Sequence, residues 1–276
     1  MTGHAEVRAH NASVSLIGRF VAIAFAFAWL QWFAVIASAR HWLPWHVPLT
    51  PLGSFGPAIA AALLLPGKEA RRAWWASLRR WRVRPVVILS ACFLLPLAAA
   101  ACFAVASSVK GDWSRPALPG IGIILAASLE ILLLGGPLGE EPGWRGFLLP
   151  ELRKSLSAFQ ASVVVGLLWF AWHLPLFWVP GAPQQELSMW KFAVALLAYS
   201  FVLTWLMEVG KATVLMAIVF HTSANVTFWM AAVAVSGKRI ETVFWNLYFS
   251  SLVLVAVILV SASKVFRKPY EAAMPG

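Results

Sequence analysis

Two adjacent carboxylates, Glu140 and Glu141, precede Arg145 within an otherwise apolar stretch of the sequence. An ionised carboxylate in hydrocarbon costs at least ~2.5 kcal/mol, so such groups face partners or a wet cavity. On a helix, Glu141 and Arg145 are one turn apart and can form an ion pair. Glu140 is rotated by about 100° from Glu141. The spacing therefore predicts a structural carboxylate held by Arg145 and a reactive carboxylate on Glu140.

Polar side chains also interrupt two later apolar segments. His173 lies in LLWFAWHLPLFW, and His221 and Asn225 lie one turn apart in VFHTSANVT. A single intramembrane His is typical of a satisfied core residue. Two His, an aligned Asn and a Glu pair are best explained by convergence on one cavity.

These residue types permit two kinds of hydrolysis. His173, His221 and Glu140 could ligate a metal such as zinc and lower the pKa of its bound water. Alternatively, Glu140 acts as general base on a water held by His173, while His221 and Asn225 stabilise the oxyanion. The sequence contains no HExxH, which excludes the common zincin arrangement.

The elements that position these residues are predicted to be membrane-spanning helices. The 276 residues are 61% hydrophobic and 12% charged, too apolar for a soluble globule. We predict an all-α polytopic integral membrane bundle of about eight transmembrane helices. The apolar stretches are approximately 14–39, 51–67, 85–108, 118–139, 157–179, 189–208, 213–236 and 243–263, of which the second is short and could be tilted or partly re-entrant.

The net charge of +11 follows the expected topology and does not indicate a nucleic-acid partner. If the N-terminus is cytoplasmic, 16 of the 22 Lys and Arg residues lie on the cytoplasmic side, many of them in the linker 68–84. The positive-inside rule then places both termini in the cytoplasm. The six on the other side are Arg40, Lys110, Arg115, Lys191, Lys238 and Arg239.

One further acidic residue, Glu130, lies near the expected middle of the bilayer. We expect it to be buried, and either protonated or hydrogen-bonded to a neighbouring helix. Whether it contributes to the site is left open by the sequence.

The three motifs, taken in order, resemble the CPBP family, which includes CAAX prenyl proteases of type II, Abi proteins and bacteriocin-processing enzymes. The family pattern is EExxxR, FxxxH and HxxxN, matched by Glu140 to Arg145, by Trp169 to His173 and by His221 to Asn225. Trp169 stands where the pattern has Phe. The resemblance spans roughly residues 55–227.

The resemblance implies an intramembrane endopeptidase. Glu140 would be its base, His173 would hold the water, and His221 and Asn225 would stabilise the oxyanion. Its substrate would be a membrane-bound peptide or protein, prenylated or of bacteriocin type, and whether zinc is required is open. The Ala, Arg and Trp content fits a bacterial inner (plasma) membrane protein.

We expect residues 1–50 to contain the first transmembrane helix, 51–236 the protease-like core, and 237–276 the last helix and a cytoplasmic tail. The alternative is a non-catalytic membrane immunity or binding protein that keeps the same polar residues. A proton-coupled transporter using Glu130 and Glu140 would predict internal repeats, and none is visible in the sequence.

Overall fold

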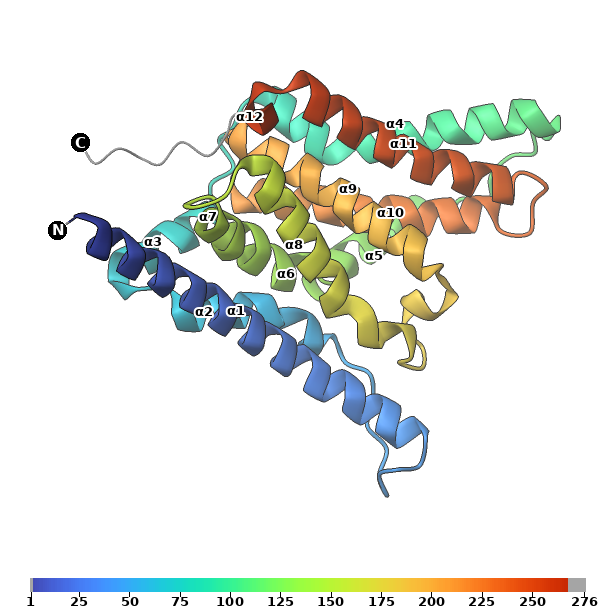
Figure 1. The fold of residues 1–276 in the computed structure, drawn as a ribbon. Helices are drawn as coiled ribbons and strands as arrows, with labels where there is room; N and C mark the ends of the chain where they lie inside the picture. Colours follow the sequence, from blue (N-terminus) through green and yellow to red (C-terminus); the bar gives the residue numbers. More distant parts are fainter. Residues whose placement is uncertain (1, 268–276) are drawn as a thin grey trace.

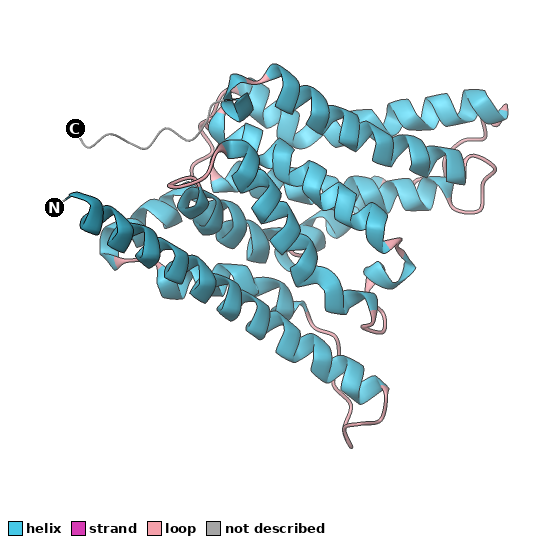
Figure 2. Cartoon of the chain, in the orientation of Figure 1, coloured by secondary structure: helices cyan, strands magenta, loops and turns pink. Residues whose placement is uncertain are grey.

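The computed structural model describes residues 2–267, and all the regular secondary structure in that range is helical (Figures 1 and 2). The predicted all-α polytopic bundle is confirmed, and within residues 2–267 seven helical segments, against about eight predicted, are long and apolar enough to cross a bilayer. They are Ser13–Ala39, Pro85–Lys110, Ile121–Leu152, Ala158–Phe177, Met189–Glu208, Val214–Val235 and Glu241–Ala262.

The segment expected to form a second full span is a short helix. It consists of η1 (Pro51–Phe55, five residues) and α2 (Gly56–Leu64, nine residues). At 1.5 Å per residue these cover about 21 Å, less than the ~30 Å of a hydrocarbon core. An extended stretch precedes η1, and the chain returns alongside α1 (Thr2–Ala39) toward the end where α1 begins (Figure 1).

The remaining helices follow in sequence. They are α3 (Gly67–Ser77), α4 (Pro85–Lys110), α5 (Ile121–Leu134), α6 (Pro137–Gly143), the π-helical turn η2 (Trp144–Leu148), α7 (Leu149–Leu152), α8 (Ala158–His173), η3 (Leu174–Phe177), η4 (Pro183–Glu186), α9 (Met189–Glu208), α10 (Val214–Val235), α11 (Glu241–Ala262) and α12 (Lys264–Arg267).

Local chemistry sets the ends of the helix that carries His173. Ser157 and Gln160 form a reciprocal capping box at the start of α8, which satisfies two backbone donors. Pro175 lies two residues beyond its end and cannot continue the backbone hydrogen-bond ladder. His173 is therefore the last residue of a capped and well-defined helix.

The third span, Ile121–Leu152, is broken in the middle, as its Gly and Pro content predicts. Gly136 has φ 108°, a conformation that L side chains rarely adopt, and Pro137 begins α6 immediately after it. A Cβ at Gly139 would meet the backbone of η1, and one at Gly143 would meet Pro57 of α2. The small residues thus let α6 pack closely against the short second helix.

The broken helix lies inside the bundle. α6 packs between α2 and α10, while α4 packs along α10 and α8 along α9. The start of α1, the basic helix α3, and the short helices α7 and α12 lie at one end of the molecule (Figure 1). This arrangement places α6, with Glu140 and Glu141, against the helix that carries His221 and Asn225.

Candidate functional site

Glu140 is buried, with 3% of its surface exposed, and one of its carboxylate oxygens is held. The indole Nε1–H of Trp169 on α8 donates to Oε2 of Glu140. The other oxygen, Oε1, lies against Gly136, where a Cβ would collide with it. Oε1 forms no hydrogen bond among residues 2–267 and is available to a water or substrate group.

Glu141 binds two partners at once. Its Oε1 accepts hydrogen bonds from Nη1 of Arg145 at 3.0 Å and from Nδ1 of His221 at 2.8 Å. The Glu141–Arg145 pair expected from the spacing is present, and both side chains are fully buried. The bond to His221 joins α6 to α10. The two residues are 80 positions apart, and no local spacing in the sequence predicts this bond.

The geometry of His173 fixes its tautomer when the ring is neutral. Its Nδ1 is 2.8 Å from the carbonyl oxygen of Trp169. A carbonyl only accepts hydrogen bonds, so Nδ1 carries the proton and Nε2 keeps its lone pair. The rings of Trp172 and Phe192 pack edge-on against the imidazole and fix its orientation.

Asn225 is less buried than the two histidines and contacts the break in the third span. Its Nδ2 donates to the carbonyl oxygen of Gly135 at 3.2 Å. An amide nitrogen has two donor hydrogens, so one remains for another acceptor. Asn225 thus ties α10 to the turn that precedes Glu140.

Trp169 is the common neighbour of the site residues. Its N–H binds Glu140, the guanidinium carbon of Arg145 lies 4.3 Å from its ring centroid, and the ring of His221 packs edge-on at 5.2 Å. Its carbonyl orients His173. The two His therefore lie on the same side of the bundle, around one indole. In the sequence, Trp169 stood out only because the family pattern has Phe at this position.

Comparisons with known proteins agree with this arrangement. Residues 122–227 match the family described as type II CAAX prenyl endopeptidase Rce1-like. A stretch of 146 residues is 33% identical to CAAX prenyl protease 2 of Methanococcus maripaludis. Residues 122–227 of this chain are therefore similar to the type II CAAX prenyl endopeptidases. Glu140, His173, His221 and Asn225 all lie within the matched residues.

The match to the archaeal relative is partial. It covers 51% of this chain and 52% of the relative, so the chain spans about half the length of the curated protein that it matches. The similarity therefore holds for about half of each protein and not for either complete protein.

The candidate ligands do not form a metal site. Among residues 2–267, no three His, Cys, Asp or Glu side chains are grouped so that they could hold a metal ion. Glu140, His173 and His221 surround an indole, and the Glu140 carboxylate already accepts its N–H. These residues do not fit the zinc alternative, and no chemical step is assigned to a metal below.

Glu130 does not occupy the position expected from the sequence. It lies on α5, whose described residues are all partly or fully exposed, and its own side chain is exposed. The expectation of a buried or hydrogen-bonded Glu130 is wrong because α5 packs along one edge of the bundle and leaves much of its surface uncovered.

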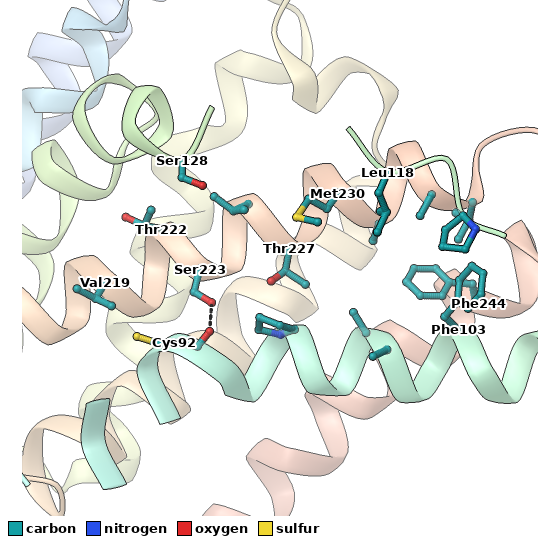
Figure 3. A pocket seen from close by; sticks show the side chains of 18 of the residues that line it. Cys92, Phe103, Leu118, Ser128, Val219, Thr222, Ser223, Thr227, Met230 and Phe244 are labelled. Atoms are coloured by element: carbon teal, nitrogen blue, oxygen red, sulfur yellow. Dashed lines mark hydrogen bonds between the residues drawn. The ribbon is translucent and has the colours of Figure 1, made fainter. Parts of the chain in front are cut away.

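An apolar cavity of about 590 Å³ lies between α4, α5 and α10 (Figure 3). Residues that line it include Pro96, Phe103, Leu132, Met230 and Phe244. Its lining residues on α10 run from Val219 to Val235 and do not include His221 or Asn225. The cavity and these two candidate residues therefore share helix α10, on different faces of that helix.

Three of the four side-chain hydroxyl groups on the cavity wall bind backbone carbonyls, and that of Thr227 forms no hydrogen bond among the described residues. Ser128 donates to the carbonyl of Ile124, Thr222 to that of Ile218, and Ser223 to that of Cys92, as the dashed line in Figure 3 shows for the last pair. These donors are not free to bind a polar ligand. The wall therefore suits a hydrocarbon chain.

Proposed function

We propose that this protein is an intramembrane endopeptidase in which Glu140 activates a water molecule for attack on a peptide bond. The observation that carries the proposal is a pair of atoms without hydrogen-bond partners, one carboxylate oxygen of Glu140 and the ring nitrogen Nε2 of His173. Glu140 Oε1 and His173 Nε2 both lack partners among the described residues, and both groups are positioned by the same Trp169.

In the proposed reaction, the water donates one hydrogen bond to Glu140 and the other to Nε2 of His173. The water oxygen forms a bond to the scissile carbonyl carbon while Glu140 takes the proton. The tetrahedral intermediate then collapses, the C–N bond breaks, and Glu140 returns the proton to the leaving amine. The peptide bond plus water thus becomes a carboxylic acid and an amine, and transfer of the second water proton from the acid to the amine gives a carboxylate and an ammonium group.

The oxyanion would be stabilised from α10. Asn225 has a second amide hydrogen beyond the one donated to Gly135, and His221 donates from Nε2 when it carries a second proton. Donors that are fixed before the reaction stabilise developing charge without reorganisation, and losing one such donor typically costs ~10²–10³ in rate.

Glu141 and Arg145 have a positioning role in this proposal. Glu141 fixes the ring of His221 through Nδ1, and Arg145 neutralises Glu141 and covers the face of Trp169. Neither group needs to touch the substrate. The two adjacent carboxylates therefore have different tasks, one reactive and one structural.

The substrate is proposed to be a lipidated, membrane-associated peptide, with its prenyl chain in the cavity between α4, α5 and α10. The cavity volume of about 590 Å³ is within the ~300–1,000 Å³ range of small-molecule sites. In a bilayer, lipid tails are as apolar as the wall, so transfer into the cavity gains little free energy. The cavity would select the shape of the chain and hold the adjacent peptide at Glu140.

The reaction is proposed to occur in a bacterial inner membrane, with both chain termini in the cytoplasm. The exposed basic residues of α3, which include Lys68, Arg71 and Arg72, lie at the end of the bundle where α1 begins. An anionic cytoplasmic leaflet attracts such a segment by about 1 kcal/mol per basic residue.

The proposal is tested with purified protein in lipid nanodiscs and a CAAX-type peptide that is farnesylated, geranylgeranylated or unmodified. Mass spectrometry of the products should show cleavage of the prenylated peptides and far less of the unmodified one. His173→Ala should abolish that cleavage. A bacteriocin-type precursor peptide is tested in the same way. If the wild-type protein cleaves none of these peptides, the alternative of a non-catalytic binding protein is favoured.

A further inference from the structure

The indole of Trp169 does something that the Phe of the family pattern cannot do, because phenyl rings have no N–H. The Nε1–H donates to Oε2 of Glu140 in the interior of the bundle, and Trp169 is only 1% exposed. A hydrogen bond to an ionised group in a dry environment is among the stronger interactions available to a protein.

We propose that Trp169 is a positioning residue for Glu140, whose indole N–H selects the orientation of the carboxylate and stabilises its ionised form. This inference rests on the proposed role of Glu140 as the base. With Oε2 held, Oε1 is directed at the reacting water, so one carboxylate rotamer is favoured over the alternatives.

Arg145 strengthens this arrangement through the face of the indole. Its guanidinium carbon lies 4.3 Å from the ring centroid, in cation–π geometry. A cation over the ring draws electron density from it and makes the N–H a better donor toward Glu140. The side chain of Trp169 thus couples the Arg145–Glu141 ion pair to the carboxylate of Glu140.

The charged and titratable groups around Glu140 come from three elements. Glu141 and Arg145 are on its own broken helix, His173 is on α8 and His221 is on α10. The sequences of η1 and α2, which pack on the other side of α6, contain no titratable residue, and Glu130 of α5 is exposed. The indole N–H is thus the uncharged donor that acts on Glu140 directly.

The test is Trp169→Phe, which keeps an aromatic ring for Arg145 and removes the N–H. We expect the acid limb of the pH profile of kcat/KM to move to higher pH, because a donor to the ionised carboxylate is lost. We also expect kcat at the optimum to fall roughly tenfold or more, because the carboxylate is no longer fixed.

Trp172→Phe is the matched control. Trp172 is equally buried on the same helix, but its N–H donates to the carbonyl of Ala24 at 3.1 Å and not to a carboxylate. This variant should lose thermal stability and leave the acid limb unchanged. If the acid limb of Trp169→Phe coincides with that of Trp172→Phe, Trp169 is merely structural and the inference is wrong.

A second measurement does not depend on activity or on the folding of Trp169→Phe. In wild-type protein with ¹⁵N-labelled indoles, the proton resonance of the Trp169 N–H should lie downfield, as for a donor to a carboxylate, and Glu140→Gln, which removes the charge of the acceptor, should move it upfield. An identical position of this resonance in both proteins would overturn the inference. Because this readout needs no catalysis, it remains informative if Glu140→Gln proves fully active and the proposed function fails.

Discussion

Nδ1 of His221 lies 2.8 Å from Oε1 of Glu141, although the two residues are 80 positions apart in the chain. The same oxygen accepts a hydrogen bond from Arg145, so the carboxylate of Glu141 joins α6 to α10. Oε2 of Glu141 and two nitrogens of Arg145, Nε and Nη2, are buried without a partner among the described residues. The pair is therefore desolvated, and each charge depends on the other.

We expect Glu141→Ala to lower the free energy of unfolding by about 3–5 kcal/mol, because it leaves Arg145 buried and uncompensated. Thermal unfolding in detergent micelles measures the loss. The double variant Glu141→Gln with Arg145→Met removes both charges and should be more stable than Glu141→Gln alone. If Arg145→Met gives no recovery in that background, the ion pair is not what stabilises this region.

Gly136→Ala should disrupt the site without changing any polar residue. Gly136 has φ 108°, and a Cβ there would collide with Oε1 of Glu140. We expect activity to fall by about 10²-fold or more, since a small displacement of a base has an effect of this size. Gly122→Ala is the control, because nothing lies within 4 Å of its added Cβ. Equal activity of the two variants would show that the Gly136 turn does not position Glu140.

These residues illustrate which contacts the sequence predicts. Glu141 and Arg145 are one turn apart, so local helix geometry was enough to expect their ion pair. The bonds from Glu141 to His221 and from Glu140 to Trp169 depend on how α6, α8 and α10 pack, and no local spacing contains that information. The sequence predicted convergence of the polar residues because each is costly in a membrane, but it did not give their pairing.

The misplaced elements have physical reasons of the same kind. The second apolar stretch was counted among about eight spans but noted as short, and tilted or partly re-entrant; it forms the short helices η1 and α2. Glu130 was expected to be buried because it lies in the middle of an apolar segment. Burial depends on the neighbouring helices, however, and α5 has few of them. The irregular helix around Glu140 has a local cause, because Gly136, Pro137 and Pro142 impose backbone constraints there. The division into residues 1–50, 51–236 and 237–276 stays a prediction.

Filling the cavity should change which lipid chain is accepted. Ala231 is buried and lines the cavity on α10. Ala231→Phe should lower kcat/KM for a geranylgeranylated peptide more than for a farnesylated one, because the longer chain needs more of the volume. Ala126→Phe, on the exposed surface of α5, should leave the ratio of the two unchanged. An unchanged ratio in Ala231→Phe would place the lipid chain elsewhere.

Chelation should leave the activity intact. The candidate ligands are not grouped as a metal site among the described residues, so we expect cleavage to continue in a strong chelator and purified active protein to contain less than stoichiometric zinc. Loss of activity with chelator and its return with zinc would require a metal mechanism, in which His173→Ala and His221→Ala would also lose the metal.

The most direct test compares two glutamates of the same broken span. Glu140→Gln keeps the shape of the side chain and an oxygen for the Trp169 N–H, but it cannot take a proton from water. We predict that it inserts and folds like the wild-type protein and cleaves a prenylated peptide at least ~10²-fold more slowly. Glu130→Gln, at an exposed position on α5, should cleave at the wild-type rate. Wild-type cleavage by Glu140→Gln would contradict the account.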